Sequence, residues 1–191
     1  GTYPGGKLGA LDLKDYSVED CGSPAPPNLY CRQVSELPDG RVLCFFNTEK
    51  PTALIFDPAT KTFGSAPPGI SNGVQGAVFD GYFVTGRQVF DGKTLEEVRP
   101  IPFPTPPAEK GRWSFNAHMT TRDTVYMQQG QALYRYKAGE RDLTLICDVD
   151  TFRSGINEVS SKGWVLGVRG QDYFVVKPGA KAAELRPIPV E

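Results

Sequence analysis

The chain has 191 residues, 39% of them hydrophobic, which is enough to bury a core. Its 21 basic and 22 acidic side chains give a formal net charge of −1, so the sequence offers no basic surface for a nucleic-acid backbone. The longest unbroken apolar run, Val42 to Phe46, is far shorter than the roughly 20 residues that cross a bilayer. We therefore expect a globular chain with no nucleic-acid partner and no membrane span.

An element made of two extended runs around a polar turn recurs along the chain. It is found at residues 10–17, 54–63, 89–98, 133–143 and 174–185. One turn residue of each serves as an anchor, namely Lys14, Asp57, Asp91, Lys137 and Lys177, and the anchors are 43, 34, 46 and 40 residues apart. The tetrapeptide Arg99-Pro100-Ile101-Pro102 also returns at residues 186–189, about two periods later. A common period near 41 residues indicates a structural repeat.

A second series lies between these elements, and each member has the pattern of a β-hairpin. The paired runs are residues 31–37 with 41–46, 73–79 with 82–85, 115–121 with 124–128, and 156–160 with 164–168. Their turns contain Gly40, Gly81, Asp123 and Gly163, residue types that accept the positive φ of tight hairpin turns. These residues are 41, 42 and 40 positions apart, so both series share one period. Together they predict a unit of four short antiparallel strands.

This unit predicts the fold class. Repeats of roughly 40 to 45 residues, each with four short antiparallel strands, are the signature of a β-propeller. The turns Asp57 to Phe63 and Phe90 to Leu95 resemble those between the outer strands of kelch-type blades. We predict an all-β chain, a β-propeller segment of about 4.5 four-stranded blades, divided as a partial blade at 1–30 and blades at about 31–70, 71–111, 112–150 and 151–191. A β-sandwich and a hemopexin-like four-bladed ring are the alternatives.

The blade count is uneven, because residues 6–21 match only the outer strand pair of a blade. An incomplete ring exposes a strand edge and a sheet face, which folded proteins normally cover. The first residue is Gly rather than Met. We therefore expect the chain to be the C-terminal part of a larger propeller of about six or seven blades, with the remainder on another chain, cleaved away or unresolved. A smaller closed ring is the alternative.

The resemblance to propellers implies a candidate ligand site where the loop entering each blade meets its innermost strand. The polar and aromatic residues at these positions are Arg32, Gln33, Gln75, Trp113, Asn116, His118, Arg153, Asn157 and Glu158. Arginine supplies a forked donor and tryptophan a stacking surface, so the set suits a polar or anionic small ligand. The alternative is that these side chains satisfy buried backbone groups around the channel.

Catalytic and metal-binding patterns are sparse. His118 is the only histidine, so a general-base role requires an orienting carboxylate, for which Glu158 of the next blade is the candidate. The sequence has no nucleophile elbow, and the four cysteines lack zinc-ligand spacing. Cys21 and Cys31 either form a disulfide in an oxidising compartment or remain free thiols. We predict no catalytic residues, no metal and no cofactor.

These features favour a non-catalytic propeller scaffold that binds a protein or glycan partner through its loop-rich face. One alternative is a propeller enzyme of polysaccharide lyase or hydrolase type, whose active site is completed by residues outside this chain. Another is a structural assembly subunit whose exposed blade edge is its interface. The compartment stays open at this stage.

Overall fold

The computed structural model describes residues 5–67, 70, 76–130, 132–148, 158–160, 162–169 and 171–188. In this part of the chain the regular structure consists of antiparallel sheets and one short 3-10 helix, η1 (Ala108–Lys110). None of the described segments forms a helix long and apolar enough to cross a membrane. The all-β content agrees with the sequence prediction.

Each sheet is made of strands that are consecutive in the chain. The first sheet contains β1 (Gly9–Leu11) and β2 (Val18–Asp20). The second contains β3 (Tyr30–Glu36), β4 (Val42–Asn47), β5 (Thr52–Asp57) and β6 (Thr62–Ser65). The third contains β7 (Gly76–Phe79), β8 (Tyr82–Thr85) and β9 (Gln88–Asp91). The fourth contains β10 (Trp113–Phe115), β11 (Thr124–Gln129), β12 (Ala132–Lys137) and β13 (Thr144–Asp148), and the fifth contains β14 (Glu158–Val159), β15 (Val165–Arg169), β16 (Asp172–Val176) and β17 (Glu184–Pro187).

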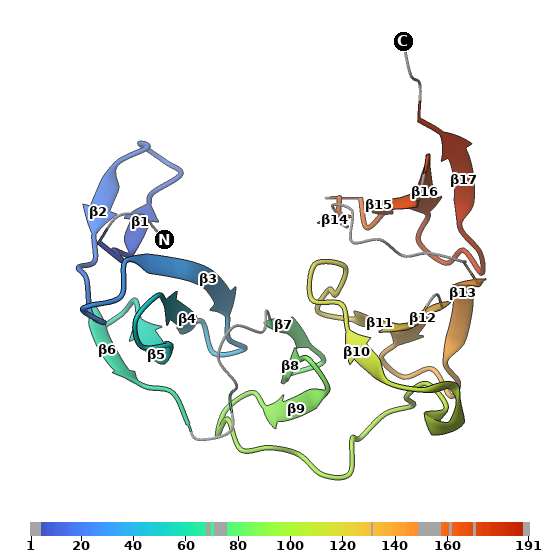
Figure 1. Cartoon of the computed structure of the whole chain (residues 1–191), viewed down its shortest axis with the longest axis horizontal. Helices are drawn as coiled ribbons and strands as arrows, with labels where there is room; N and C mark the ends of the chain where they lie inside the picture. The colour runs from blue at the N-terminus through green and yellow to red at the C-terminus, as the bar shows by residue number, and fades with distance from the viewer. Residues whose placement is uncertain are drawn as a thin grey trace.

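The five sheets follow one another around an open arc, and the first and last sheets lie on either side of the opening (Figure 1). Each pair of successive sheets encloses an apolar cluster. One buried side chain from each cluster, in order from the first pair of sheets to the last, is Phe46, Phe83, Tyr136 and Phe174. The core is therefore divided among the interfaces between sheets.

The strand β4 shows why a continuous apolar run forms the inner part of a sheet. Leu43 and Phe45 point toward the third sheet, whereas Cys44 and Phe46 point toward the first. Successive side chains of a strand alternate between faces, so a strand covered on both sides needs apolar residues at every position. All four side chains are at most 2% exposed.

The third sheet departs from the four strands that the repeat predicts. Its fourth position holds only an isolated bridge between Phe90 and Glu97. The Val98 N–H still donates to the Val89 carbonyl at 2.8 Å. Proline has no N–H for a ladder, so Pro100 limits the pairing at this point.

The strand β10 is shorter than the run 115–121 that the sequence predicts. It ends at Phe115, and residues 117–119 form a turn in which the Met119 N–H donates to the Asn116 carbonyl at 3.3 Å. The turn brings the fully buried side chain of Met119 into the cluster between the fourth and fifth sheets. Apolar burial thus replaces strand pairing at these residues.

Three turns share one geometry, which starts at Asp12, Asp57 and Asp91. In each turn the aspartate carboxylate accepts a hydrogen bond from the N–H two positions later, at 2.8, 2.8 and 2.9 Å respectively. The residue four positions after the aspartate has a positive φ: Tyr16 at 60°, Lys61 at 56° and Leu95 at 58°. The equivalent of the anchors Asp57 and Asp91 in the first element is therefore Asp12, not Lys14.

These turns make the stability of the fold dependent on pH. Hydrogen bonds from backbone N–H groups hold the pKa of Asp57 and of Asp91 below the usual value. Such carboxylates favour the folded state above their unfolded-state pKa of about 3.9, and this contribution is lost as the pH falls through the lower folded-state pKa. We expect the urea midpoint of unfolding to fall between about pH 5 and about pH 2, and to fall less steeply in the double variant Asp57→Asn/Asp91→Asn.

Asp142→Asn is the control for this measurement, because no hydrogen bond to its carboxylate is found within the described residues. The Asp142 variant should follow the wild-type curve. An identical pH dependence in the double variant and the wild type would show that the two turns do not contribute.

Candidate functional site

The nine predicted ligand-binding residues are only partly covered by the structure. Arg32 is exposed on β3 at a bulge, and Gln33 beside it is half-buried with its Oε1 atom buried and unpartnered. Asn116 and His118 lie on the turn after β10 rather than on a strand, and His118 is exposed. Gln75, Arg153 and Asn157 lie outside the described residues, as does the side chain of Glu158.

Trp113 begins β10 and packs into the cluster between the third and fourth sheets, with 8% of its surface exposed. The guanidinium carbon of Arg87 lies over its ring, 5.7 Å from the centroid, and the Phe115 ring meets it nearly at a right angle. A cavity of about 420 Å³ beside Arg87 and Trp113 is also lined by residues 97–101. Because Arg87 covers the indole, Trp113 offers less of a stacking surface than the sequence predicts.

A cleft of about 750 Å³, which we call the basic cleft, lies between the fourth and fifth sheets. Four hairpin turns border it, namely 121–124, 137–142, 162–163 and 178–181. Its basic residues are Arg135, Lys137, Arg141, Lys162 and Lys181, against the acidic residues Asp123, Glu140 and Asp142. The described lining therefore has an excess of positive charge.

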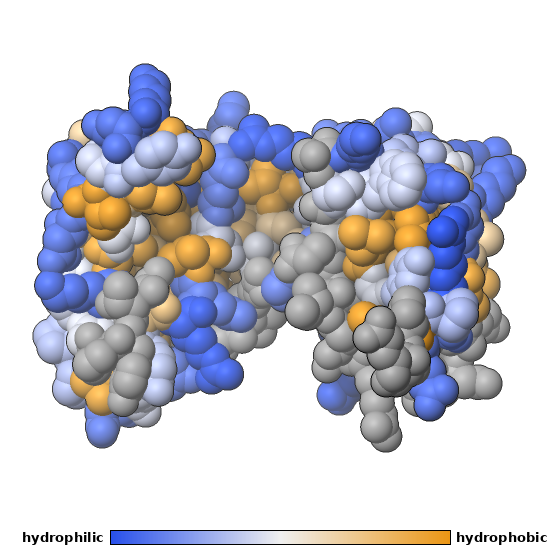
Figure 2. Space-filling model, turned by 90° about the horizontal axis from the view of Figure 1, so that it is seen from above, coloured by the Kyte–Doolittle hydropathy of each residue, from blue (hydrophilic) through white to orange (hydrophobic). Residues whose placement is uncertain are grey.

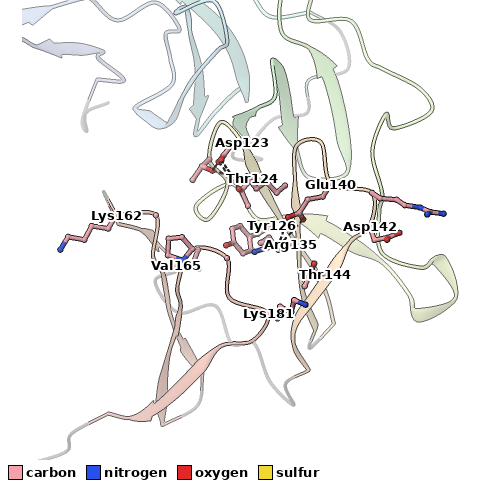
Figure 3. Close-up of a pocket in the computed structure, with 16 residues that line it drawn as sticks. Asp123, Thr124, Tyr126, Arg135, Glu140, Asp142, Thr144, Lys162, Val165 and Lys181 are labelled. Atoms are coloured by element: carbon pink, nitrogen blue, oxygen red, sulfur yellow. Dashed lines mark hydrogen bonds and ion pairs between the residues drawn. The ribbon is translucent and has the colours of Figure 1, made fainter.

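A row of three side chains forms the wall of the basic cleft on the fourth sheet. Tyr126 of β11 is paired with Arg135 of β12, which is paired with Thr144 of β13, so the three share one sheet face. Val165 of β15 lies on the facing wall, and Figure 3 shows Tyr126 and Arg135 next to each other, beside Val165. The row continues the apolar cluster between the two sheets, to which Tyr126 and Val165 belong.

Arg135 is nearly buried but poorly paired. Its side chain is 11% exposed, and its Nε atom is buried with no hydrogen-bond partner in the part of the chain that the structure describes. Nη1 donates to the Ala180 carbonyl and Nη2 to both oxygens of Glu140, all at 3.4 Å. Charge-assisted hydrogen bonds are usually about 2.7–2.9 Å long, and a buried donor without a partner costs about 1–3 kcal/mol. The cation is therefore incompletely satisfied by the protein.

The pKa of Tyr126 is affected both by its burial and by the neighbouring charge of Arg135. Burial raises the pKa of Tyr126, and the nearby positive charge of Arg135 partly opposes that shift. Tyr126 is 6% exposed, so its phenol stays neutral and able to donate a hydrogen bond in the neutral pH range. The cleft thus combines a permanent cation with a neutral hydroxyl.

The basic cleft is not apparent from the amino-acid sequence. Its charges come from four turns that are far apart in the chain, and no short motif joins them. One local signal exists, because Leu133, Arg135 and Lys137 alternate on one face of a predicted strand. That pattern places Arg135 on an interface between sheets but says nothing of what faces it.

The cysteines do not form a metal site in the described structure. Cys21, Cys31 and Cys44 are free thiols that meet at the interface between the first and second sheets. The Cys44 thiol donates to the Val42 carbonyl at 3.7 Å, and its interaction with the neighbouring Cys31 thiol lowers the pKa of Cys31 to about 7 and raises that of Cys44. Among the described residues, no cluster of three or more His, Cys, Asp or Glu side chains is arranged to hold a metal ion.

Exposed apolar side chains gather at the two ends of the arc. In the first sheet, Leu11 and Val18 face each other across the strand pair and are 53% and 74% exposed. At the fifth sheet, Trp164, which directly precedes β15, and Leu166 of β15 are 38% and 40% exposed. Outside these two sheets, the exposed large apolar side chains among the described residues are Leu29, Tyr30, Val34 and Leu145. Figure 2 shows apolar surface on both sides of the opening.

No family model and no curated protein matches the chain. Among solved structures, the chain is similar to the dihydro-heme d1 dehydrogenase NirN in complex with DHE, with a TM-score of 0.58 and 17% sequence identity over 99% of this chain. It spans 43% of the length of that chain. A structural genomics protein of unknown function from Bacteroides thetaiotaomicron VPI-5482 gives a TM-score of 0.47 at 12% identity, covering 97% of this chain and 56% of that one, which is too low to support an argument about the fold.

The NirN match, which has a β-propeller fold, agrees with the succession of antiparallel sheets around the arc. An identity of 17% supports the fold and not a shared activity. The resemblance of the Asp57 and Asp91 turns to kelch-type turns stays a prediction. This chain is an all-β protein with a β-propeller fold.

Proposed function

We propose that the chain is a non-catalytic propeller scaffold that binds a protein partner, and that the partner packs against the two end sheets of the arc. The observation that carries this proposal is the concentration of exposed apolar side chains on those sheets. A surface patch of this kind is typical of a protein interface rather than of a free surface. The end sheets are also the places where a propeller packs its next blade.

The faces involved follow from the pairing register. Glu19 of β2 forms an ion pair with Lys61 of the second sheet, so its side chain points toward that sheet. Val18 is the next residue along the strand, and Val18 and its partner Leu11 therefore lie on the opposite face, away from the protein. At the other end, Val165 is buried against the fourth sheet, which places Trp164 and Leu166 on the outer face of the fifth.

The first sheet also leaves part of its neighbour uncovered. Val34 of β3 is paired with Cys44 of β4, and the two residues share the face that the first sheet covers. Cys44 is fully buried, whereas Val34 is 45% exposed. A two-stranded sheet therefore covers the outer part of this face and leaves the inner part, at β3, free for strands supplied by a partner.

A measurement of the native mass of the purified chain tests this proposal. In such a sample, the only available partner is a second copy of the chain. We expect the mass to exceed that of one chain at high concentration and to return to the monomer in the variant Val18→Ser/Leu166→Ser. Leu145→Ser is the matched control, because Leu145 is 42% exposed but lies on the fourth sheet. A chain that stays monomeric at all concentrations, or a control variant that dissociates equally, would overturn the proposal.

A further inference from the structure

The basic cleft contains a cation that the protein itself does not satisfy. Among the described residues, Arg135 makes only long contacts, at 3.4 Å, to Glu140 and to the Ala180 carbonyl, although its side chain is 11% exposed. A guanidinium stays charged at every pH at which proteins fold. A buried charge of this kind is normally matched by a close carboxylate or phosphate. The described part of the site therefore lacks an anion at normal contact distance.

The groups around Arg135 are donors that suit such an anion. Figure 3 shows Tyr126, Thr144 and Lys181 around Arg135, while Lys162 extends away from them. The hydroxyls of Tyr126 and Thr144 donate hydrogen bonds, and Lys181 adds a second positive charge from the turn of the fifth sheet. These donors come from both walls, so a ligand between them would contact both sheets.

We propose that the basic cleft binds a small anion carrying phosphate or carboxylate groups, with Arg135 as the main contact. At about 750 Å³, the cavity lies within the usual range for small-molecule sites. Neither the propeller fold nor the end-sheet interface requires this site, so the two proposals fail independently.

The Glu140 carboxylate competes with a bound anion for Arg135. Its side chain is 39% exposed and sits in the turn after β12, where it accepts the long hydrogen bonds from Arg135. An incoming anion competes with this carboxylate for the same Nη2 donor. The removal of the Glu140 charge should therefore tighten anion binding, which a purely structural role of Arg135 does not predict.

Calorimetric titration of the purified chain at low salt, with pyrophosphate in one arm and citrate in the other, tests the site. We expect at least one of the two to bind, and its affinity to fall about tenfold in Arg135→Gln and about threefold in Lys181→Gln. Glu140→Gln should bind about threefold more tightly. Lys93→Gln, which removes the same charge from an exposed turn on the third sheet, should bind as the wild type does.

The two arms identify the source of the anion. Binding of pyrophosphate alone assigns a phosphate ligand, and binding of citrate alone assigns a carboxylate. The proposal would be overturned if neither compound gave a heat of binding. It would also be overturned if the affinity fell no further in Arg135→Gln and Lys181→Gln than in Lys93→Gln. Should Arg135→Gln fail to fold, the opposite effects of Lys181→Gln and Glu140→Gln decide the question.

Discussion

The variant Gly92→Ala should lose about 3 kcal/mol or more of folding free energy, because the added methyl has no space. An ideal Cβ at Gly92 would lie 2.0 Å from the carbonyl oxygen of Gly81 and 2.4 Å from Cγ of Pro38. Gly81 belongs to the same sheet, whereas Pro38 lies in a turn of the preceding sheet. The backbone oxygen cannot move without disturbing the β7–β8 turn, so the contact between the two sheets must open.

Gly64→Ala is the control for this variant. Gly64 lies on β6 with an ordinary φ, and an added Cβ meets no atom within 4 Å. Its replacement should change the unfolding free energy by about 0.5 kcal/mol or less. The two variants are compared by urea denaturation, and equal stabilities would show that the second and third sheets do not meet at Gly92.

Phe83→Ala should destabilise the protein by about 3–5 kcal/mol, since it leaves a cavity in the core. Phe83 is fully buried in the cluster that joins the second and third sheets. Its ring also lies against Gly76, where an ideal Cβ would come within 2.0 Å of Cζ. Gly76→Ala should therefore cost about 1–3 kcal/mol by itself, through overpacking.

The losses of unfolding free energy caused by Gly76→Ala and Phe83→Ala should not be additive. In the Phe83→Ala background the ring is gone, and the methyl of Ala at position 76 occupies part of the cavity. We expect Gly76→Ala/Phe83→Ala to be no less stable than Phe83→Ala, a coupling of at least about 1 kcal/mol. A strictly additive loss of stability in the double variant would contradict the contact between the ring and Gly76.

The local rules of strands and turns account for much of what the sequence predicts correctly. Gly40, Gly81 and Gly163, chosen as hairpin residues, all have a positive φ, between 71° and 87°. The run Val42 to Phe46 forms β4 with its side chains shared between two interfaces. These features depend on residues close together in the chain, so the pattern is sufficient to find them.

The remaining features depend on contacts between sheets. His118 lies on a turn because Met119 beside it is buried in the next interface, which no alignment of hairpins reveals. The arginine over Trp113 comes from a turn of another sheet. The basic cleft requires the register of two sheets and the conformation of four turns. A period in the sequence gives the order of the sheets but not the side chains that meet between them.

Amide hydrogen exchange at β1 and β2 tests the central claim, that the end sheets are uncovered until a partner packs on them. All six residues of these strands are exposed, and an isolated two-stranded sheet is only marginally stable. In the dilute monomer we predict fast exchange at β1 and β2 and slow exchange at β4, with β1 and β2 becoming protected as the chain assembles. Equal protection of β1, β2 and β4 in the monomer, or no change on assembly, would contradict the account.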